Sequence, residues 1–154
     1  MVDWLSERLL TVLLTSDIYM PTAGYSGTPL AKKLGIKEGF RIALYNQPDY
    51  YFALFTDFPE NVKVINKAPV DLIHCFVTEE KKLSGDIIKL KSSIQPNGAI
   101  WISWPKKSSK VATDVTEDVI RNIALKNGLV DIKVCAVDNT WSGLKLVIPV
   151  KDRK

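Results

Sequence analysis

Residues 70–107 constrain the fold of this chain most strongly, because they have the pattern of a strand, a helix, a turn and a second strand. Asp71 precedes an unbroken apolar run, as in strands that are buried on both faces of a parallel sheet. Residues 96–98, Pro-Asn-Gly, predict a turn, and residues 99–104 form a second apolar run. The segment between the strands has apolar residues at helical spacing: Leu83, Ile87, Leu90 and Ile94. Such a connection crosses over right-handed, so the two strands are predicted to be parallel.

Shorter elements are predicted before this unit. Thr28 and Pro29 are typical of a helix start, with a capping hydroxyl before a proline, and Gly35 supplies the stop. Residues 41–45 form the first predicted strand. Residues 47–49, Gln-Pro-Asp, are expected to open a helix that runs to about residue 55, and residues 62–65 form a brief second strand.

The elements after the central unit complete one α/β domain. The spacing Asp114-x-x-Glu117 resembles a capping box and predicts a helix that stops at Gly128. Asp118 also has the position of a helix-start carboxylate. Residues 131–137 form another apolar strand, residues 138–143 a turn, and residues 144–150 a strand that returns antiparallel. No internal repeat or linker interrupts the pattern, so one domain accounts for residues 24–150.

Residues 1–19 differ from the rest of the chain. They have an apolar stripe at helical spacing, formed by Trp4, Leu5, Leu9, Val12 and Leu13. We expect an amphipathic extension that docks on the domain or on a partner. The alternative is that Met20 is the natural start and that residues 20–154 are the whole domain. The acidic residues Asp3 and Glu7 argue against a secretory signal peptide.

Charge and cysteine content restrict the function only broadly. The net charge is +4 and the pI is about 9.0; residues 1–19 have a net charge of −2, which leaves +6 for residues 20–154. This balance weakly favours anionic partners. Cys75 and Cys135 fall in predicted buried strands without the spacing of a zinc site or a disulfide framework, so we expect a reduced, cytoplasmic protein. No apolar run approaches the roughly 18 residues of a membrane span. The sequence does not indicate an oligomeric state.

The order of the elements resembles that of Rossmann-like methyltransferases, which use S-adenosylmethionine. Residues 34–39 (LGIKEG) resemble the lead-in to their first strand, and residues 71–77 resemble their central strand. The chain resembles more closely a family of small, uncharacterised bacterial proteins. Three blocks carry that likeness: residues 23–37 (AGYSGTPLAKKLGIK), 102–118 (ISWPKKSSKVATDVTED) and 135–147 (CAVDNTWSGLKLV). It implies a three-layer Rossmann-like α/β fold, mostly parallel with a C-terminal antiparallel hairpin strand, and no established activity.

Two departures from the methyltransferase pattern bear on the cofactor. The turn after the first strand in such enzymes is rich in glycine, which lets backbone N–H groups approach the cofactor. Here that turn is Tyr45-Asn46-Gln47-Pro48-Asp49, without glycine. The acidic residue that ends the second strand is replaced by Asn66-Lys67. We therefore predict no cofactor, with S-adenosylmethionine kept as an alternative.

Polar and aromatic residues follow the predicted strands where they end, which is where open α/β sheets bind ligands. We predict a ligand site there, formed by Asn46, Trp104, Lys106, Lys107, Trp141 and Lys145. The lysines supply positive charge and the tryptophans supply stacking surface. The structural alternatives are a solvated lysine loop and tryptophans that pack on the domain.

The other reactive residue types have simpler interpretations. His74 is the single histidine and alternates with apolar neighbours, so we predict a buried, neutral, hydrogen-bonded ring rather than a general base. No metal-ligand spacing or phosphate-binding loop is present. The sequence favours a non-catalytic or regulatory binding domain for an anionic small molecule or partner. The alternatives are an atypical S-adenosylmethionine-dependent methyltransferase and a weak nucleic-acid binder.

Overall fold

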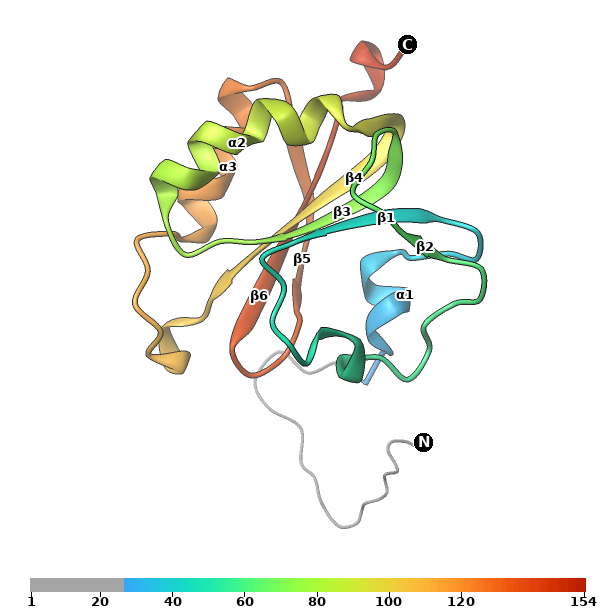
Figure 1. The fold of residues 1–154 in the computed structure, drawn as a ribbon. Helices are drawn as coiled ribbons and strands as arrows, with labels where there is room; N and C mark the ends of the chain where they lie inside the picture. The colour runs from blue at the N-terminus through green and yellow to red at the C-terminus, as the bar shows by residue number, and fades with distance from the viewer. Residues whose placement is uncertain (1–26) are drawn as a thin grey trace.

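The computed structural model describes residues 27–154, in which one six-stranded sheet has the strand order β2-β1-β3-β4-β6-β5 (Figure 1). β1, β2, β3 and β4 pair in parallel, whereas β6 pairs antiparallel with both β4 and β5. The predicted sheet, mostly parallel with a C-terminal antiparallel hairpin, is thus confirmed. The stretch predicted to be amphipathic, residues 1–19, lies outside the described residues. The strands are β1 (Arg41–Tyr45), β2 (Lys63–Val64), β3 (Val70–Phe76), β4 (Ile94–Pro105), β5 (Val130–Ala136) and β6 (Trp141–Val147).

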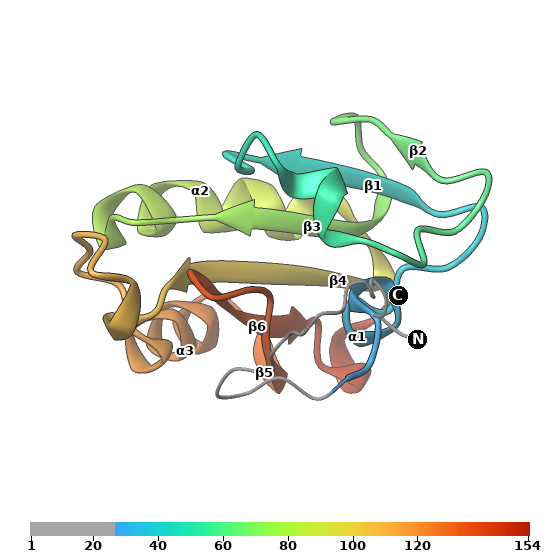
Figure 2. The ribbon, with the colours of Figure 1, turned by 90° about the horizontal axis from the view of Figure 1, so that it is seen from below.

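Helices cover both faces of the sheet, which gives the predicted three layers. Figure 1 shows α2 (Glu80–Ser92) and α3 (Glu117–Lys126) on one face and α1 (Leu30–Leu34) on the other. The 3-10 turn η1 (Tyr51–Leu54) packs on the same face as α1. Figure 2 shows β2 and β5 at the two edges of the sheet. Two further 3-10 turns are η2 (Lys107–Ser109) and η3 (Val150–Asp152).

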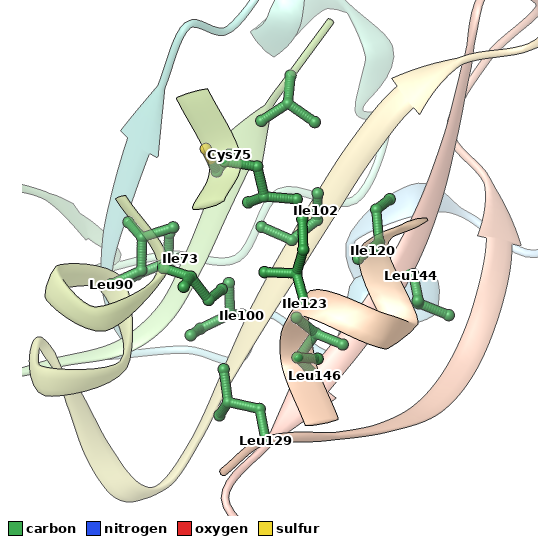
Figure 3. Packing of buried hydrophobic residues seen from close by; sticks show 14 of the residues in the cluster. Ile73, Cys75, Leu90, Ile100, Ile102, Ile120, Ile123, Leu129, Leu144 and Leu146 are labelled. Atoms are coloured by element: carbon green, nitrogen blue, oxygen red, sulfur yellow. The ribbon is translucent and has the colours of Figure 1, made fainter. Parts of the chain in front are cut away.

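The larger hydrophobic core fills the layer between the sheet and the helices α2 and α3. The labelled side chains of Figure 3 come from β3, β4, β6, both helices and, with Leu129, the turn before β5, and they meet in one cluster. α2 buries its predicted stripe at Leu83, Ile87 and Leu90. α3 buries Ile120 and Ile123 in the same cluster. The helical spacing in the sequence therefore identified the faces that hold this core together.

A smaller core fixes α1 over the middle of the sheet. Trp101 of β4 is fully buried, and its indole Nε1 donates a hydrogen bond to the carbonyl oxygen of Leu34 at 2.8 Å. Gly143 of β6 leaves room for this indole, because a Cβ atom there would lie 3.1 Å from Cε3 of Trp101. Gly35 ends α1 in the left-handed conformation, as predicted. The position of α1 matters because its C-terminal end borders the site described below.

Two predicted helix starts are wrong in their capping groups. Pro29 caps α1 without a side-chain hydrogen bond, and the carboxylate of Asp57 accepts the N–H groups of Ala31 and Lys32 at 3.0 Å each. α3 begins at Glu117 with Thr116 as its cap, so Asp114-x-x-Glu117 is not its capping box. The cap of α1 comes from a distant carboxylate, and that of α3 comes from a residue inside the predicted motif but not from its first position.

Three other expectations are corrected. Residues 47–55 contain only the short η1 turn instead of a helix. Residues 96–98 do not end a separate element but lie inside β4, in an irregular stretch between the pairs Val70–Ile94 and Leu72–Ala99. Cys135 is only partly buried, because β5 is an edge strand. Cys75 is buried as predicted, and burial raises the pKa of its thiol to about 12.

Candidate functional site

The carboxyl ends of β1 and β3 meet at the point where ligands commonly bind in open α/β sheets. The chain leaves β1 for β2 on one side and returns to β3 on the other, which makes this gap a topological switch point. Asn46 follows β1 with a positive φ of 59°, and its side-chain Nδ2 donates to the carbonyl oxygen of Phe76 at 3.3 Å. The side chain of Asn46 therefore ties the two strand ends together across the switch point.

Aromatic rings cover the same strand ends on the face that carries α1. Tyr51 is 1% exposed and packs edge-on against Phe76 at a centroid distance of 5.8 Å. Phe76 in turn packs edge-on against Trp141 at 5.0 Å. Burial and the adjacent carboxylate of Asp138 raise the pKa of the Tyr50 hydroxyl, so the loop after β1 reaches the turn between β5 and β6. Side chains of the protein itself thus occupy the surface above the ends of β1 and β3.

A buried polar group lies beneath these rings. The Tyr51 hydroxyl is 2.9 Å from Nδ1 of His74, and Nε2 of His74 is 2.7 Å from Oγ of Ser103. All three side chains are buried, and burial lowers the pKa of the imidazole to about 3. The prediction of a buried, neutral, hydrogen-bonded histidine is confirmed. Although a serine, a histidine and a tyrosine are linked, none is accessible to a substrate, so the group holds the sheet together.

The two tryptophans of the predicted site lie on opposite faces of the sheet. Trp104 is opposite Ser142, and its neighbour Pro105 is opposite Trp141, so Trp104 and Trp141 point in opposite directions. Trp104 packs against the core under α2 and α3, whereas Trp141 packs against the core under α1. One small ligand cannot stack on both indoles. Packing contacts account for where both rings lie.

The predicted lysines separate into two kinds. Lys107 is exposed in η2. Lys106 follows β4, and its backbone N–H donates to the carbonyl oxygen of Thr140 at 2.8 Å. The charge of Lys106 acts to lower the pKa of Lys33 and of Cys135. Lys145 lies in the middle of β6 rather than at a strand end, with its Nζ atom beside Gly35.

Lys106 and Lys145 belong to a group of five lysines that gather beside the C-terminal end of α1. We call this group the lysine cluster: Lys33, Lys37, Lys106, Lys133 and Lys145. Lys133 is directly opposite Lys145 in the β5–β6 pair. The Nζ atom of Lys133 donates to the carbonyl oxygen of Lys33 at 3.2 Å, and that of Lys33 donates to the carbonyl oxygen of Ala136 at 3.1 Å. The cluster therefore joins α1 to the edge of the sheet.

Burial and mutual repulsion both act on the pKa values of lysines in the cluster. Burial and the charges of Lys133 and Lys37 lower the pKa of Lys145. Burial also lowers the pKa of Lys33; the negative charge of a Cys135 thiolate would oppose this shift, and the charges of Lys106 and Lys133 add to it. Burial raises the pKa of the Cys135 thiol, although three of the lysines oppose this shift. Cys135 thus lies in the middle of a positively charged surface as a protonated thiol.

Three members of the lysine cluster have no carboxylate partner within the described part of the chain. Lys106, Lys133 and Lys145 form no ion pair with any carboxylate of residues 27–154; the ion pairs there involve Lys82 and Arg121. Residues 27–154 also contain no group of three histidine, cysteine or acidic side chains that could hold a metal ion. None of the helices in this region has the length and apolar character needed to cross a membrane. The chemistry available at the cluster is the binding of negative charge.

Three members of the cluster were missed in the sequence: Lys33, Lys37 and Lys133. A signal was present for Lys133, because it interrupts the otherwise apolar strand around Cys135. The positions of Lys33 and Lys37 next to it depend on how α1 packs on the sheet, which the local pattern does not contain.

The sequence profile of a family described as "Protein of unknown function (DUF3052)" matches residues 66–150, which is more than half of the chain. The chain belongs to this family. The DUF3052 match begins before β3 and extends into η3, so it includes Lys106, Lys133 and Lys145. The resemblance to a family of uncharacterised proteins is confirmed, and the family description assigns no activity. A search of curated proteins finds no match.

Methyltransferases are among the solved structures that are similar to this DUF3052 chain. Magnesium protoporphyrin IX methyltransferase from Synechocystis, solved with bound SAH, has a TM-score of 0.55 at 12% identity, covering 77% of this chain and 78% of that chain. A SAM-dependent methyltransferase from Aquifex aeolicus has a TM-score of 0.53 at 16% identity, covering 76% of this chain and 87% of that chain. Mitomycin 7-O-methyltransferase MmcR has a TM-score of 0.54 at 8% identity; 82% of this chain aligns, but it spans only 51% of that chain. At such low identities the likeness shows the fold alone, and it confirms the predicted methyltransferase-like scaffold.

Proposed function

We propose that this DUF3052 chain is a non-catalytic or regulatory binding domain for an anionic small molecule or partner, held at the lysine cluster. Lys106 and Lys145 are retained from the site predicted in the sequence, and Lys133 is added to them. Asn46 and Trp104 are left out of the site: the former bonds across the switch point, and the latter faces the opposite core. A reducing, cytoplasmic setting is part of the proposal, because both cysteines are free.

The directly opposed pair Lys133 and Lys145 carries this proposal. Like charges opposite each other in a sheet destabilise it by roughly 0.2–1 kcal/mol. Burial of Lys145 adds to that cost, and no carboxylate of the described residues offsets it. A local arrangement of charge that weakens the fold is expected where the residues have a function. A bound anion would relieve the repulsion.

The test compares two variants of equal charge in the full chain. Lys145→Gln is expected to raise the free energy of unfolding by roughly 0.2–1 kcal/mol, because it removes one of two facing charges. The same variant is expected to weaken phosphate binding at least tenfold in isothermal titration calorimetry. Lys63→Gln is the control, because Lys63 lies in β2 at the other edge of the sheet. Equal effects of both variants, or a loss of stability in Lys145→Gln, would contradict the proposal.

A second candidate function is that of an atypical S-adenosylmethionine-dependent methyltransferase, which the fold of the solved structures favours. Against it stand the contact of Asn46 with Phe76 and the burial of Tyr51 at the switch point. Thermal melts with and without S-adenosylhomocysteine separate the two candidates. A ligand at about a hundred times its dissociation constant stabilises by about 2.7 kcal/mol, so a clear shift in melting temperature would favour the methyltransferase.

A further inference from the structure

The members of the lysine cluster are spread along the strands rather than gathered at one point. Lys145 pairs with Trp101 of β4, whereas Lys106 follows Pro105, four residues further along that strand. At about 3.3 Å per residue, the two backbone positions are more than about 13 Å apart. Cys135 lies between them along the sheet, because it is opposite Gly143, two residues from Lys145 in the direction of Pro105. The two ends therefore place positive charge at separate positions along the sheet, which a molecule with more than one anionic group can span.

We infer that the lysine cluster selects a small molecule that carries at least two anionic groups of the phosphate type. One group is held by the facing pair Lys133 and Lys145, and the other is held beyond Cys135 by Lys106. This inference rests on the proposed function and adds the class of ligand. Ammonium groups on flexible lysine stems suit phosphate oxygens as point charges, without the planar geometry that arginine imposes. A molecule that spans the two ends binds with higher affinity than a single anion. Once its first anionic group is bound, the second one binds in an effectively intramolecular step.

The probes are inorganic phosphate, pyrophosphate and tripolyphosphate, titrated into the full chain at constant ionic strength. We expect the affinity to rise at least tenfold from phosphate to tripolyphosphate. Lys106→Gln should abolish most of that gain and change the affinity for phosphate less than twofold, because phosphate is held at the other end. Lys145→Gln should weaken the binding of all three probes. Lys63→Gln, which changes the net charge equally, should leave the series unchanged.

The thiol of Cys135 gives a second readout at the centre of the cluster. Cys75 is buried, so a neutral reagent such as iodoacetamide should modify Cys135 first, as followed by mass spectrometry. Tripolyphosphate should slow that modification more than phosphate does, because only the longer anion crosses the position of Cys135.

The outcomes separate this inference from the proposed function. Equal affinities for phosphate and tripolyphosphate would overturn the choice of a multiply charged ligand, as would a Lys106→Gln variant that weakens the binding of both probes alike. In either case the proposed function, the binding of an anion at the lysine cluster, would still stand. Absence of binding by all three probes would overturn both. Tighter binding of a DNA duplex than of tripolyphosphate, with a steep dependence on salt, would overturn the inference in favour of nucleic acid.

Discussion

His74 illustrates how a polar side chain is held inside the sheet. Its two ring nitrogens are paired with Tyr51 and Ser103, which lie 23 and 29 residues away in the sequence. The neutral ring therefore keeps both of its hydrogen bonds without water, whereas a protonated ring would be a buried charge without a counter-ion. Strand alternation was enough to predict that the ring is buried. Its partners depend on the register of β3 with β4 and on the position of η1.

We predict that the protein loses stability as the pH falls below about 6.5, the ordinary pKa of histidine in an unfolded chain. The pKa of His74 in the folded protein is about 3. Between these two values the unfolded chain binds more protons, so the free energy of unfolding falls by up to about 1.4 kcal/mol per pH unit. Urea unfolding between about pH 6.5 and pH 5, above the range in which most carboxylates titrate, measures this decrease.

The imidazole itself provides the control for that experiment. His74 is the single histidine of the chain, so its ring protons give one set of NMR signals. Signals that hold their position down to about pH 4 in the folded protein are expected from its low pKa. A titration midpoint near the ordinary value of about 6.5 would show that the ring is accessible and would contradict the buried network.

At the scale of elements, α2 and α3 are capped by residues that lie close together in the sequence but act on different helices. The carboxylate of Asp114 accepts the N–H of Glu80 at 2.7 Å, at the start of α2. The hydroxyl of Thr116 accepts the N–H of Val119 at 3.2 Å, at the start of α3. The loop before α3 thus supplies a capping group to both helices. A carboxylate three residues before Glu117 looked like a local cap, since the sequence does not reveal the proximity of α2.

We predict that Asp114→Ala destabilises the protein by about 0.5–2 kcal/mol and acts on α2. Amide hydrogen exchange should become faster at Glu80, with the first turn of α3 unchanged. Thr116→Ala should have the opposite pattern, with faster exchange at Val119. Asp114→Asn is the matched control, because its side-chain oxygen can still accept the hydrogen bond. Faster exchange in α3 on substitution of Asp114 would restore the capping box and contradict the account.

For the whole molecule, the sequence predicted the sheet better than the site. Apolar runs and helical stripes are local, and they were enough for the parallel unit of β3, α2 and β4 and for the final antiparallel hairpin. The short elements were harder to predict. The η1 turn has too few residues to show a helical periodicity in the sequence. The irregular stretch at Gly98 depends on a close approach to the backbone, because an added Cβ atom there would lie 3.0 Å from the carbonyl oxygen of Asp71. The lysine cluster was predicted only in part, because it requires α1 to lie against β5.

A ¹H–¹⁵N NMR titration of the full chain with tripolyphosphate tests directly whether the lysine cluster is the binding site. We expect saturable shift changes at Gly35, Lys133, Cys135 and Lys145, around the end of α1 and the middle of the β5–β6 pair. Changes confined to Asn46, Tyr51 and Thr78 at the ends of β1 and β3 would instead place the ligand at the switch point. That result, or the absence of saturable changes, would contradict the assignment of the lysine cluster as the binding site.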